Sequence, residues 1–251
     1  MTMLRRACDT VLARLPVGSF TAEELAAGLA PAFRTSLGPL AGGRALADIP
    51  RQDRLAELGF ELPLAGGEVA RADVSLGDLV PLLREHLPPD DPLAAYPDAL
   101  ADPVLAEQTL RGFLTGSIDA VLRVDGPDGE PRYLVVDYKT NWLGPLEGPP
   151  LTVGQYTPPR MAEAMIRAHY PLQALLYAVA VHRLMRWRQP GYDPDRHHGG
   201  VLYLFVRGMA GPTTPAVDGV PCGVFSWRPP GALVTALSDL LDGHRPAGGT
   251  R

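Results

Sequence analysis

Three charged residues near the middle of the chain have the types and the spacing of a metal-dependent site, with two carboxylates to hold the ion and one lysine beside them. Asp119 and Asp137 lie among apolar and β-branched neighbours, and Lys139 follows two residues after the second carboxylate. A carboxylate in apolar surroundings is costly to bury unless it is paired or holds a cation. Two carboxylates that share one site repel each other, and a hard divalent ion with oxygen ligands relieves that repulsion. The three residues therefore predict a divalent metal site.

Lys139 is the only lysine among the 23 basic side chains, and the other 22 are arginines. Arginine replaces lysine wherever a solvated positive charge is enough, but it cannot deprotonate or act as a compact point charge. Asp137 and Lys139 are two residues apart on a predicted strand, so both side chains point to the same face. We therefore expect the lysine beside the metal, where it can orient or deprotonate water or stabilise charge on a phosphate oxygen.

A structural alternative explains the same residues without chemistry. In that alternative, Asp137 and Lys139 form an ion pair at the end of a strand, and Asp119 is solvated at an edge of the sheet. The spacing alone leaves both interpretations open. The single lysine favours chemistry.

A β-hairpin must position the two carboxylates. Residues 111–124 and 132–138 are apolar and β-branched, and residues 125–130 between them are dense in turn formers. Antiparallel pairing across this turn brings Asp119 and Asp137 together on one face. The long proline-rich segment that follows, residues 141–159, is of a length that is usually functional or disordered.

A helix after the hairpin carries a second pair of polar residues. Helical sequence runs from residue 160 to 188 and restarts at Pro171, which is acceptable in a first turn. Gln173 and Tyr177 are four residues apart and share one helix face. In the functional interpretation, Gln173 hydrogen-bonds the attacking water or a phosphate and Tyr177 supports the site. In the structural one, both belong to a helix that faces the core.

Residues 160–196 carry an excess of positive charge. A phosphate backbone could be held there, and a solvated helix face explains the excess equally well. The arginines are Arg160, Arg167, Arg183, Arg186, Arg188 and Arg196, and the carboxylates are Glu163, Asp193 and Asp195.

The remaining pattern predicts an α/β arrangement around one mixed sheet, because helices, a hairpin and further strands alternate along the chain. Thr21 is the expected N-cap of a helix. The expected elements are two helices within residues 1–50, a strand at 58–64, two helical pieces within 75–107, strands at 199–207 and 223–227, and a helix at 231–241.

Composition excludes several classes of protein. The chain has 251 residues, 46% of them hydrophobic, and a formal net charge of −5, which argues against coating nucleic acid by bulk charge. Cys8 and Cys222 are too few for a four-cysteine zinc site or an iron–sulfur cluster. A Gly-x-x-x-x-Gly-Lys-Ser/Thr loop is absent, so we expect no ATP site. No apolar run approaches the roughly 18 residues of a membrane span, and we expect a cytoplasmic protein without membrane contact.

Four segments in this order resemble the C-terminal nuclease domain of the RecB subunit of RecBCD (exonuclease V), within the PD-(D/E)XK nuclease superfamily. They are GSIDAVLR, VVDYKTNWLG, YPLQALLYAVAVHR and GGVLYLFVRG. The resemblance implies a restriction-endonuclease-like α/β fold, in which helices flank a central mixed sheet with a catalytic hairpin. It assigns residues 55–251 to a RecB-type nuclease domain, with the strongest match over 111–209. Residues 1–54 are then a helical lead-in segment or a remnant of a preceding region.

The resemblance implies Mg²⁺-dependent hydrolysis of DNA phosphodiester bonds in double-strand-break repair and recombination. Asp119 and Asp137 resemble the carboxylates that bind one or two magnesium ions, and the backbone carbonyl of Tyr138 resembles a further ligand. Lys139 resembles the catalytic lysine. The helix motif of RecB-type nucleases is matched by Gln173 and Tyr177.

Further expectations follow from the same resemblance. Asn141 and Trp142 match the segment after the lysine, and we expect them to shape the loop there. The implied partners are DNA ends, single- or double-stranded, together with a RecB helicase portion and RecC- and RecD-like subunits if the chain is part of a full complex.

One part of the family's pattern is missing. RecB-type nucleases carry a further histidine ligand on a helix upstream of the hairpin, and the only histidine before Asp119 is His86, whose surroundings do not match. Glu61 is an early strand carboxylate, which we expect to be exposed. The chain is then a fragment that begins after that helix, or a degenerate copy. The alternative function is a catalytically inactive nuclease-fold module that binds DNA or a partner; another keeps the fold and changes the substrate to RNA or branched DNA.

Overall fold

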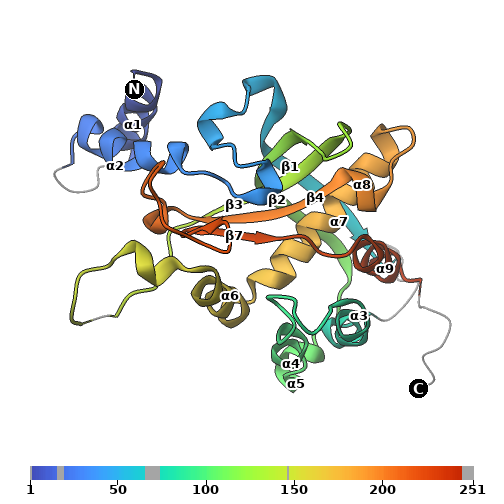
Figure 1. Ribbon diagram of the computed structural model, residues 1–251. Helices are drawn as coiled ribbons and strands as arrows, with labels where there is room; N and C mark the ends of the chain where they lie inside the picture. Colours follow the sequence, from blue (N-terminus) through green and yellow to red (C-terminus); the bar gives the residue numbers. More distant parts are fainter. Residues whose placement is uncertain (1, 16–19, 66–73, 146, 245–251) are drawn as a thin grey trace.

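A five-stranded mixed sheet forms the centre of the computed structural model, which describes residues 2–15, 20–65, 74–145 and 147–244 (Figure 1). The strand order is β1-β2-β3-β4-β7, in which β3 and β4 are parallel and the other neighbours are antiparallel. The predicted α/β fold with a central mixed sheet and flanking helices is confirmed, and it is consistent with a PD-(D/E)XK-like nuclease fold. The strands are β1 (Arg54–Leu64), β2 (Gly112–Asp125), β3 (Pro131–Lys139), β4 (His198–Phe205) and β7 (Val224–Trp227), with a separate pair, β5 (Ala216–Val217) and β6 (Val220–Pro221).

The predicted hairpin is formed by β2 and β3. Ala120 lies opposite Val136, and the pairing continues toward the turn. The turn closes where the backbone N–H of Gly126 donates to the carbonyl of Glu130 at 2.8 Å. Gly129 has a φ of +79°, a left-handed conformation that glycine adopts without a steric penalty. The turn formers in the sequence therefore act as predicted.

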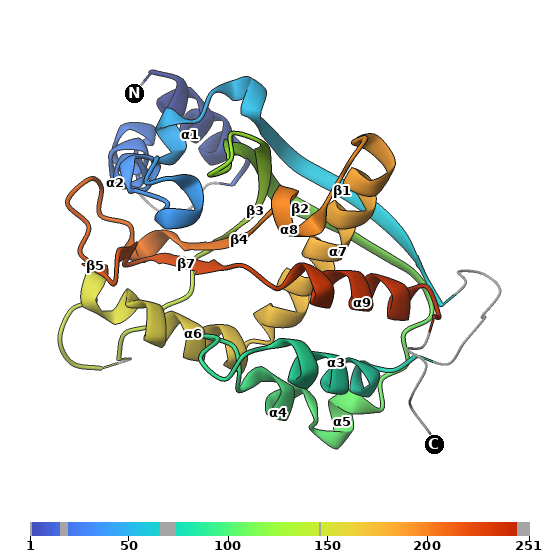
Figure 2. The same ribbon diagram turned by 45° about the vertical axis from the view of Figure 1, so that its right-hand side comes forward.

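Parallel neighbours such as β3 and β4 require a crossover. In the described part of this crossover, the helices are α6 (Pro158–Arg167), α7 (Tyr170–Arg188) and the short α8 (Pro194–His197). The restart at Pro171 is confirmed, since this proline lies in the first turn of α7, where its missing N–H has no intrahelical partner to lose. Helix α7 is part of this crossover, and it packs against β3 and β4 on one face of the sheet (Figure 2).

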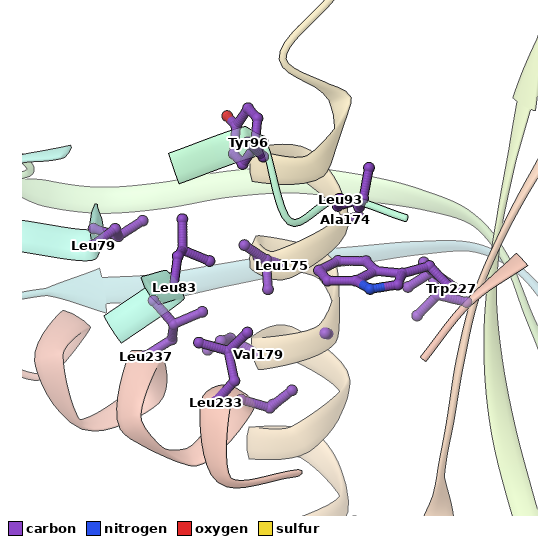
Figure 3. Close-up of a cluster of buried hydrophobic side chains, with 14 of the residues drawn as sticks. Leu79, Leu83, Leu93, Tyr96, Ala174, Leu175, Val179, Trp227, Leu233 and Leu237 are labelled. Atoms are coloured by element: carbon purple, nitrogen blue, oxygen red, sulfur yellow. The ribbon is translucent and has the colours of Figure 1, made fainter. Parts of the chain in front are cut away.

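The main core lies between that face and the helices beyond it. Side chains from α3 (Leu79–His86), α7, β7 and α9 (Gly231–Leu241) meet there (Figure 3). Leu83, Leu175, Leu233 and Trp227 are all buried. Burying such side chains stabilises the fold by about 1.5–3 kcal/mol each relative to exposure. This packing fixes α7 against the sheet.

The second face of the sheet is covered by short turns from the N-terminal region. Leu37, Leu46 and Ile49 pack against Leu122 and other inward residues of β2, β3 and β4. The turns are η1 (Pro39–Ala41), η2 (Leu46–Asp48) and η3 (Arg51–Asp53).

Two helices precede these turns, as predicted. They are α1 (Thr2–Arg14) and α2 (Ala22–Arg34), and they share a small separate cluster with Cys8 and Ala26 (Figure 1). Thr21 is the N-cap of α2, as predicted, and forms a reciprocal capping box with Glu24.

Residues 75–107 differ from the prediction of two helical pieces. After η4 (Leu76–Asp78), the structure has three helices there, namely α3, α4 (Tyr96–Leu100) and α5 (Pro103–Ala106). The additional break arises because Asp102 precedes a proline, which disfavours the helical conformation, and caps the next helix by accepting from the N–H of Val104 at 2.9 Å. Along the described ranges, no helix is both long and apolar enough to cross a membrane.

Candidate active site

The end of β3 brings Asp137 and Lys139 to the face of the sheet that α7 covers. The Lys139 Nζ lies 2.5 Å from the Asp137 Oδ2, and the two side chains are 12% and 5% exposed. The predicted sharing of one face is confirmed. An ion pair this deeply buried costs desolvation energy, so it does not by itself indicate a gain in stability.

Helix α7 holds this lysine through a chain of hydrogen bonds. The Lys139 Nζ donates to the Gln173 Oε1 at 3.0 Å, and the Gln173 Nε2 donates to the Tyr177 hydroxyl at 2.9 Å. The Tyr177 hydroxyl in turn donates to the backbone carbonyl of Ser117 on β2 at 2.9 Å. The helix face that carries Gln173 and Tyr177 is thus tied to both strands of the hairpin.

Two tyrosines complete the surroundings of Lys139, and the sequence analysis did not identify them. The ammonium lies 4.0 Å from the ring centroid of Tyr170 and 5.0 Å from that of Tyr203. The Tyr203 hydroxyl also donates to the Gln173 Oε1 at 3.1 Å. A ring face stabilises a desolvated cation. For Tyr203, the sequence did offer a signal, namely a phenol among the apolar residues 201–205 of a predicted strand.

Asp119 lies where the pairing of β1 and β2 is interrupted. Ala56 pairs with Ala120 and Leu58 with Ile118, but the pair between them, Glu57 and Asp119, is missing, and Glu57 has a φ of +51°. The Asp119 Oδ2 accepts a hydrogen bond from the backbone N–H of Tyr138 at 2.9 Å. Asp119 is therefore held against the end of β3, next to Asp137.

Burial controls the electrostatics of these groups. Loss of solvent raises the pKa of Asp137 above its ordinary value; Lys139 opposes this rise, and the negative charge of Asp119 adds to it. Burial likewise raises the pKa of Tyr177. The pKa of Tyr203 is also raised, mainly by burial and further by the charge of Asp137. The site thus holds two neighbouring carboxylates, the buried Asp137 and the partly exposed Asp119, beside the single positive charge of Lys139.

The donor set fits a hard cation. The buried Asp137 Oδ2 lies 2.5 Å from the Lys139 Nζ and has no other polar partner among the described residues, so its remaining lone pair can ligate a cation. Carboxylate and carbonyl oxygens are the ligands that Mg²⁺ prefers. Over the described ranges, no group of three His, Cys, Asp or Glu side chains could hold a metal ion. Glu61 is exposed on β1, as expected, and His86 lies in the last turn of α3.

The loop after β3 is organised by the residues expected to shape it. The Asn141 Nδ2 donates to the Tyr170 hydroxyl at 3.2 Å, and its backbone carbonyl accepts from the Tyr156 hydroxyl at 2.8 Å. The Trp142 Nε1 donates to the carbonyl of Pro145 at 3.0 Å. Both residues therefore fix the path of the chain beside Lys139.

The fold and the arrangement of these residues are consistent with the PD-(D/E)XK-like class of nuclease folds. Over 232 residues, 92% of its length, the chain is 57% identical to the RecBCD enzyme subunit RecB of Mycolicibacterium smegmatis and covers 21% of that protein. It is 56% identical over 226 residues to the RecB subunit of Mycobacterium tuberculosis and covers 20% of it. The RecB subunit of Escherichia coli is 33% identical over 201 residues, with 14% covered.

The chain thus spans about a fifth, or less, of the length of these curated relatives. No protein-family model matches it. The relatives carry the name of the subunit that the sequence motifs resemble.

Proposed function

We propose that this chain is a Mg²⁺-dependent deoxyribonuclease module of the RecB type, which hydrolyses DNA phosphodiester bonds. The observation that carries the proposal is the buried Asp137–Lys139 pair, held by Gln173 beside a second carboxylate, Asp119. A buried carboxylate with a raised pKa, here Asp137 at the end of a strand, favours a functional site over a structural ion pair.

Asp119, Asp137 and the backbone carbonyl of Tyr138 would hold the cation. When bound, a divalent ion polarises the scissile phosphate and lowers the pKa of a coordinated water. The charge deficit of the site supports this assignment, because two neighbouring carboxylates face one lysine.

Lys139 is the residue to which we assign the work on the reacting groups. Its Nζ is a compact positive charge that orients the attacking water or stabilises charge on a phosphate oxygen. Gln173 fixes the position of this ammonium, and Tyr177 fixes Gln173. We therefore assign Gln173 and Tyr177 as positioning residues. This departs from the expectation that Gln173 itself binds the water or the phosphate.

The biological setting that we propose is double-strand-break repair and recombination. It rests on the relatives named RecBCD enzyme subunit RecB and on the coverage of 92% of this chain by one of them. The partners would then be DNA ends, a RecB helicase portion, and RecC- and RecD-like subunits.

A second candidate is a catalytically inactive module that binds DNA or a partner protein. The observation that favours it is the metal-ligand set, in which the described residues include no group of three His, Cys, Asp or Glu side chains. A set with fewer protein ligands would bind Mg²⁺ more weakly, and weak occupancy would leave the fold intact without cleavage.

Degradation of linear DNA separates the two candidates. The purified chain is incubated with single- and double-stranded DNA, with Mg²⁺ or with a chelator, beside a Lys139→Ala variant. The proposal expects cleavage that requires Mg²⁺ and is lost in the variant. A folded chain that binds DNA but never cleaves it at millimolar Mg²⁺ would support the binding module instead.

A further inference from the structure

A cleft beside the candidate active site has the composition of a nucleotide subsite. It lies between the loop after β3 and helix α6, and its volume is about 360 Å³. Its lining includes Trp142 from the loop and Arg160, Glu163 and Arg167 from the helix. The relays that hold Lys139 and Gln173 do not use any of these four side chains.

Trp142 has the properties of a stacking platform. Its side chain is large and apolar, yet 48% of the residue is exposed. The hydrogen bond from its Nε1 to the carbonyl of Pro145 fixes the indole and leaves the ring face free of that contact. Gly144 permits this arrangement, because a Cβ there would lie 3.2 Å from the indole nitrogen and 2.7 Å from a Leu151 methyl. Every base has a flat face that can stack on such a ring.

The charges around the platform favour a phosphate backbone. Arg160 and Arg167 are exposed, and among the described residues neither one takes part in an ion pair or a hydrogen bond. The Arg207 guanidinium lies 5.9 Å from the Trp142 ring and is held by a hydrogen bond from its Nε to the carbonyl of Thr140 at 2.9 Å. The cleft lining thus carries two arginines and a single carboxylate, that of Glu163, and Arg207 adds a third positive charge beside the Trp142 ring.

Two side chains link the cleft to the surroundings of Lys139. Asn141 lines the cleft and donates to the Tyr170 hydroxyl, and the Lys139 ammonium lies 4.0 Å from the centroid of the Tyr170 ring. The cleft and the candidate active site are therefore neighbours.

We propose that this cleft binds an unpaired nucleotide of a DNA strand, with the base on Trp142 and the adjoining phosphates near Arg160, Arg167 and Arg207. The proposal rests on the function proposed above, because it positions the strand at Lys139. Within a duplex, each base already stacks on its neighbours and pairs with its partner, so only the terminal base pair has a ring face free to meet the indole. The subsite therefore selects single-stranded over double-stranded DNA.

The test is equilibrium binding of a fluorescein-labelled oligothymidylate and of a duplex of the same length, measured by anisotropy in a chelator. The variants are Trp142→Leu, Trp142→Phe and the double variant Arg160→Gln with Arg167→Gln. The matched controls are Trp187→Leu and a second double variant, Arg6→Gln with Arg14→Gln, at two exposed arginines of α1. Trp187 matches Trp142 because it is an exposed tryptophan, 76% accessible, with an arginine guanidinium, that of Arg188, 4.8 Å from its ring. It lies at the C-terminal end of α7, whereas Gln173 lies at the N-terminal end.

Trp142→Leu is expected to weaken binding of the single strand about 5- to 150-fold, the range reported for loss of one base–aromatic stack. Trp142→Phe, which keeps a ring, is expected to retain most of the affinity. The arginine double variant is expected to reduce the slope of log K against log salt by about 1.4, at about 0.7 for each lost phosphate contact to a single strand. The control variants are expected to bind the single strand as tightly as the unaltered chain. Duplex is expected to bind more weakly than the single strand, and its affinity should be the same for the Trp142 variants and the unaltered chain.

The proposal is overturned if folded Trp142→Leu binds the oligothymidylate as tightly as the unaltered chain. It is also overturned if Trp187→Leu loses as much affinity, or if duplex binds as tightly as single strand. Because the assay contains a chelator, it does not depend on hydrolysis. A chain that never cleaves DNA but binds it through Trp142 would refute the proposed function and leave the subsite standing. A chain that cleaves DNA but binds it equally well without Trp142 would refute the subsite and leave the proposed function standing.

Discussion

The Nζ of Lys139 and the Oε1 of Gln173 lie 3.0 Å apart, although the two residues are 34 positions apart in the chain. One belongs to β3 and the other to α7, so this hydrogen bond joins the sheet to the helix that covers it. Gln173 accepts from the lysine and from the Tyr203 hydroxyl, and it donates to Tyr177. These three bonds fix the orientation of its amide and, through it, the position of the ammonium.

Replacement of Lys139 tests the central assignment. Lys139→Ala is expected to lower the rate of DNA cleavage about 10²- to 10⁴-fold, the usual contribution of a positioned acid or base. Lys139→Arg is expected not to restore activity, because a planar guanidinium cannot replace a compact ammonium between Asp137, Gln173 and the Tyr170 ring. Initial rates on labelled single-stranded DNA at saturating Mg²⁺ give the comparison. Substantial cleavage by a folded Lys139→Ala chain would contradict the assignment.

Tyr177→Phe tests the positioning role of the α7 relay. The variant leaves the Gln173 Nε2 and the Ser117 carbonyl without their partner and so releases the Gln173 amide from its fixed orientation. We expect kcat to fall while KM for DNA stays the same, because the ammonium is misplaced but the DNA surface is intact. Single-turnover and steady-state kinetics separate the two parameters. A rise in KM alone would assign Tyr177 to DNA binding instead.

Asp137→Asn is expected to separate stability from metal binding. Burial raises the pKa of Asp137 in the folded chain, so the protonated form stabilises the fold below the ordinary pKa, and this stabilisation is lost as pH rises through the raised value. A neutral amide at neutral pH should therefore keep or raise the Tm of the metal-free chain.

Mg²⁺ should raise the Tm of the unaltered chain, because a ligand that binds only the folded state stabilises it. It should leave the Tm of Asp137→Asn unchanged. Thermal unfolding in a chelator and in a Mg²⁺ series measures both effects. An equal Mg²⁺ shift in the two proteins would place the cation elsewhere.

Two buried histidines predict acid sensitivity in another part of the fold. His182 and His198 are each 2% exposed, and burial lowers the pKa of each to about 4; the nearby Arg186 and Arg183 lower that of His182 further, and Asp239 opposes them. Both ring nitrogens of His198 lack a hydrogen-bond partner.

The unfolded chain takes up protons first as pH falls below about 6.5, so the free energy of unfolding is expected to fall between pH 6.5 and 4. The pKa shift of His198 alone corresponds to about 3 kcal/mol. His198→Leu should flatten this fall, whereas replacement of the exposed His244 by alanine should not. Urea unfolding midpoints across this pH range measure the effect, and parallel curves for His198→Leu and the unaltered chain would contradict it.

The local geometry of the candidate site follows from residue types and their spacing. Alternation along a strand put Asp137 and Lys139 on one face, helical spacing put Gln173 and Tyr177 on one face, and turn formers set the hairpin. These relationships depend on φ and ψ over a few neighbouring residues, and residue types report them directly. The same local signals gave the N-cap of α2 and the restart of α7.

Which of these faces meet depends on the tertiary structure. Spacing does not reveal the approach of Tyr170 and Tyr203 to Lys139, the missing β1–β2 pair at Glu57 or the cover of the second sheet face by residues 37–49. Each depends on how the β3–β4 crossover places α7 against the sheet and on which apolar surfaces bury one another. The free energy gained by burial is proportional to the apolar area removed from water, and it has no preferred direction. Periodicity indicates that a face is buried, but it does not say against which residues.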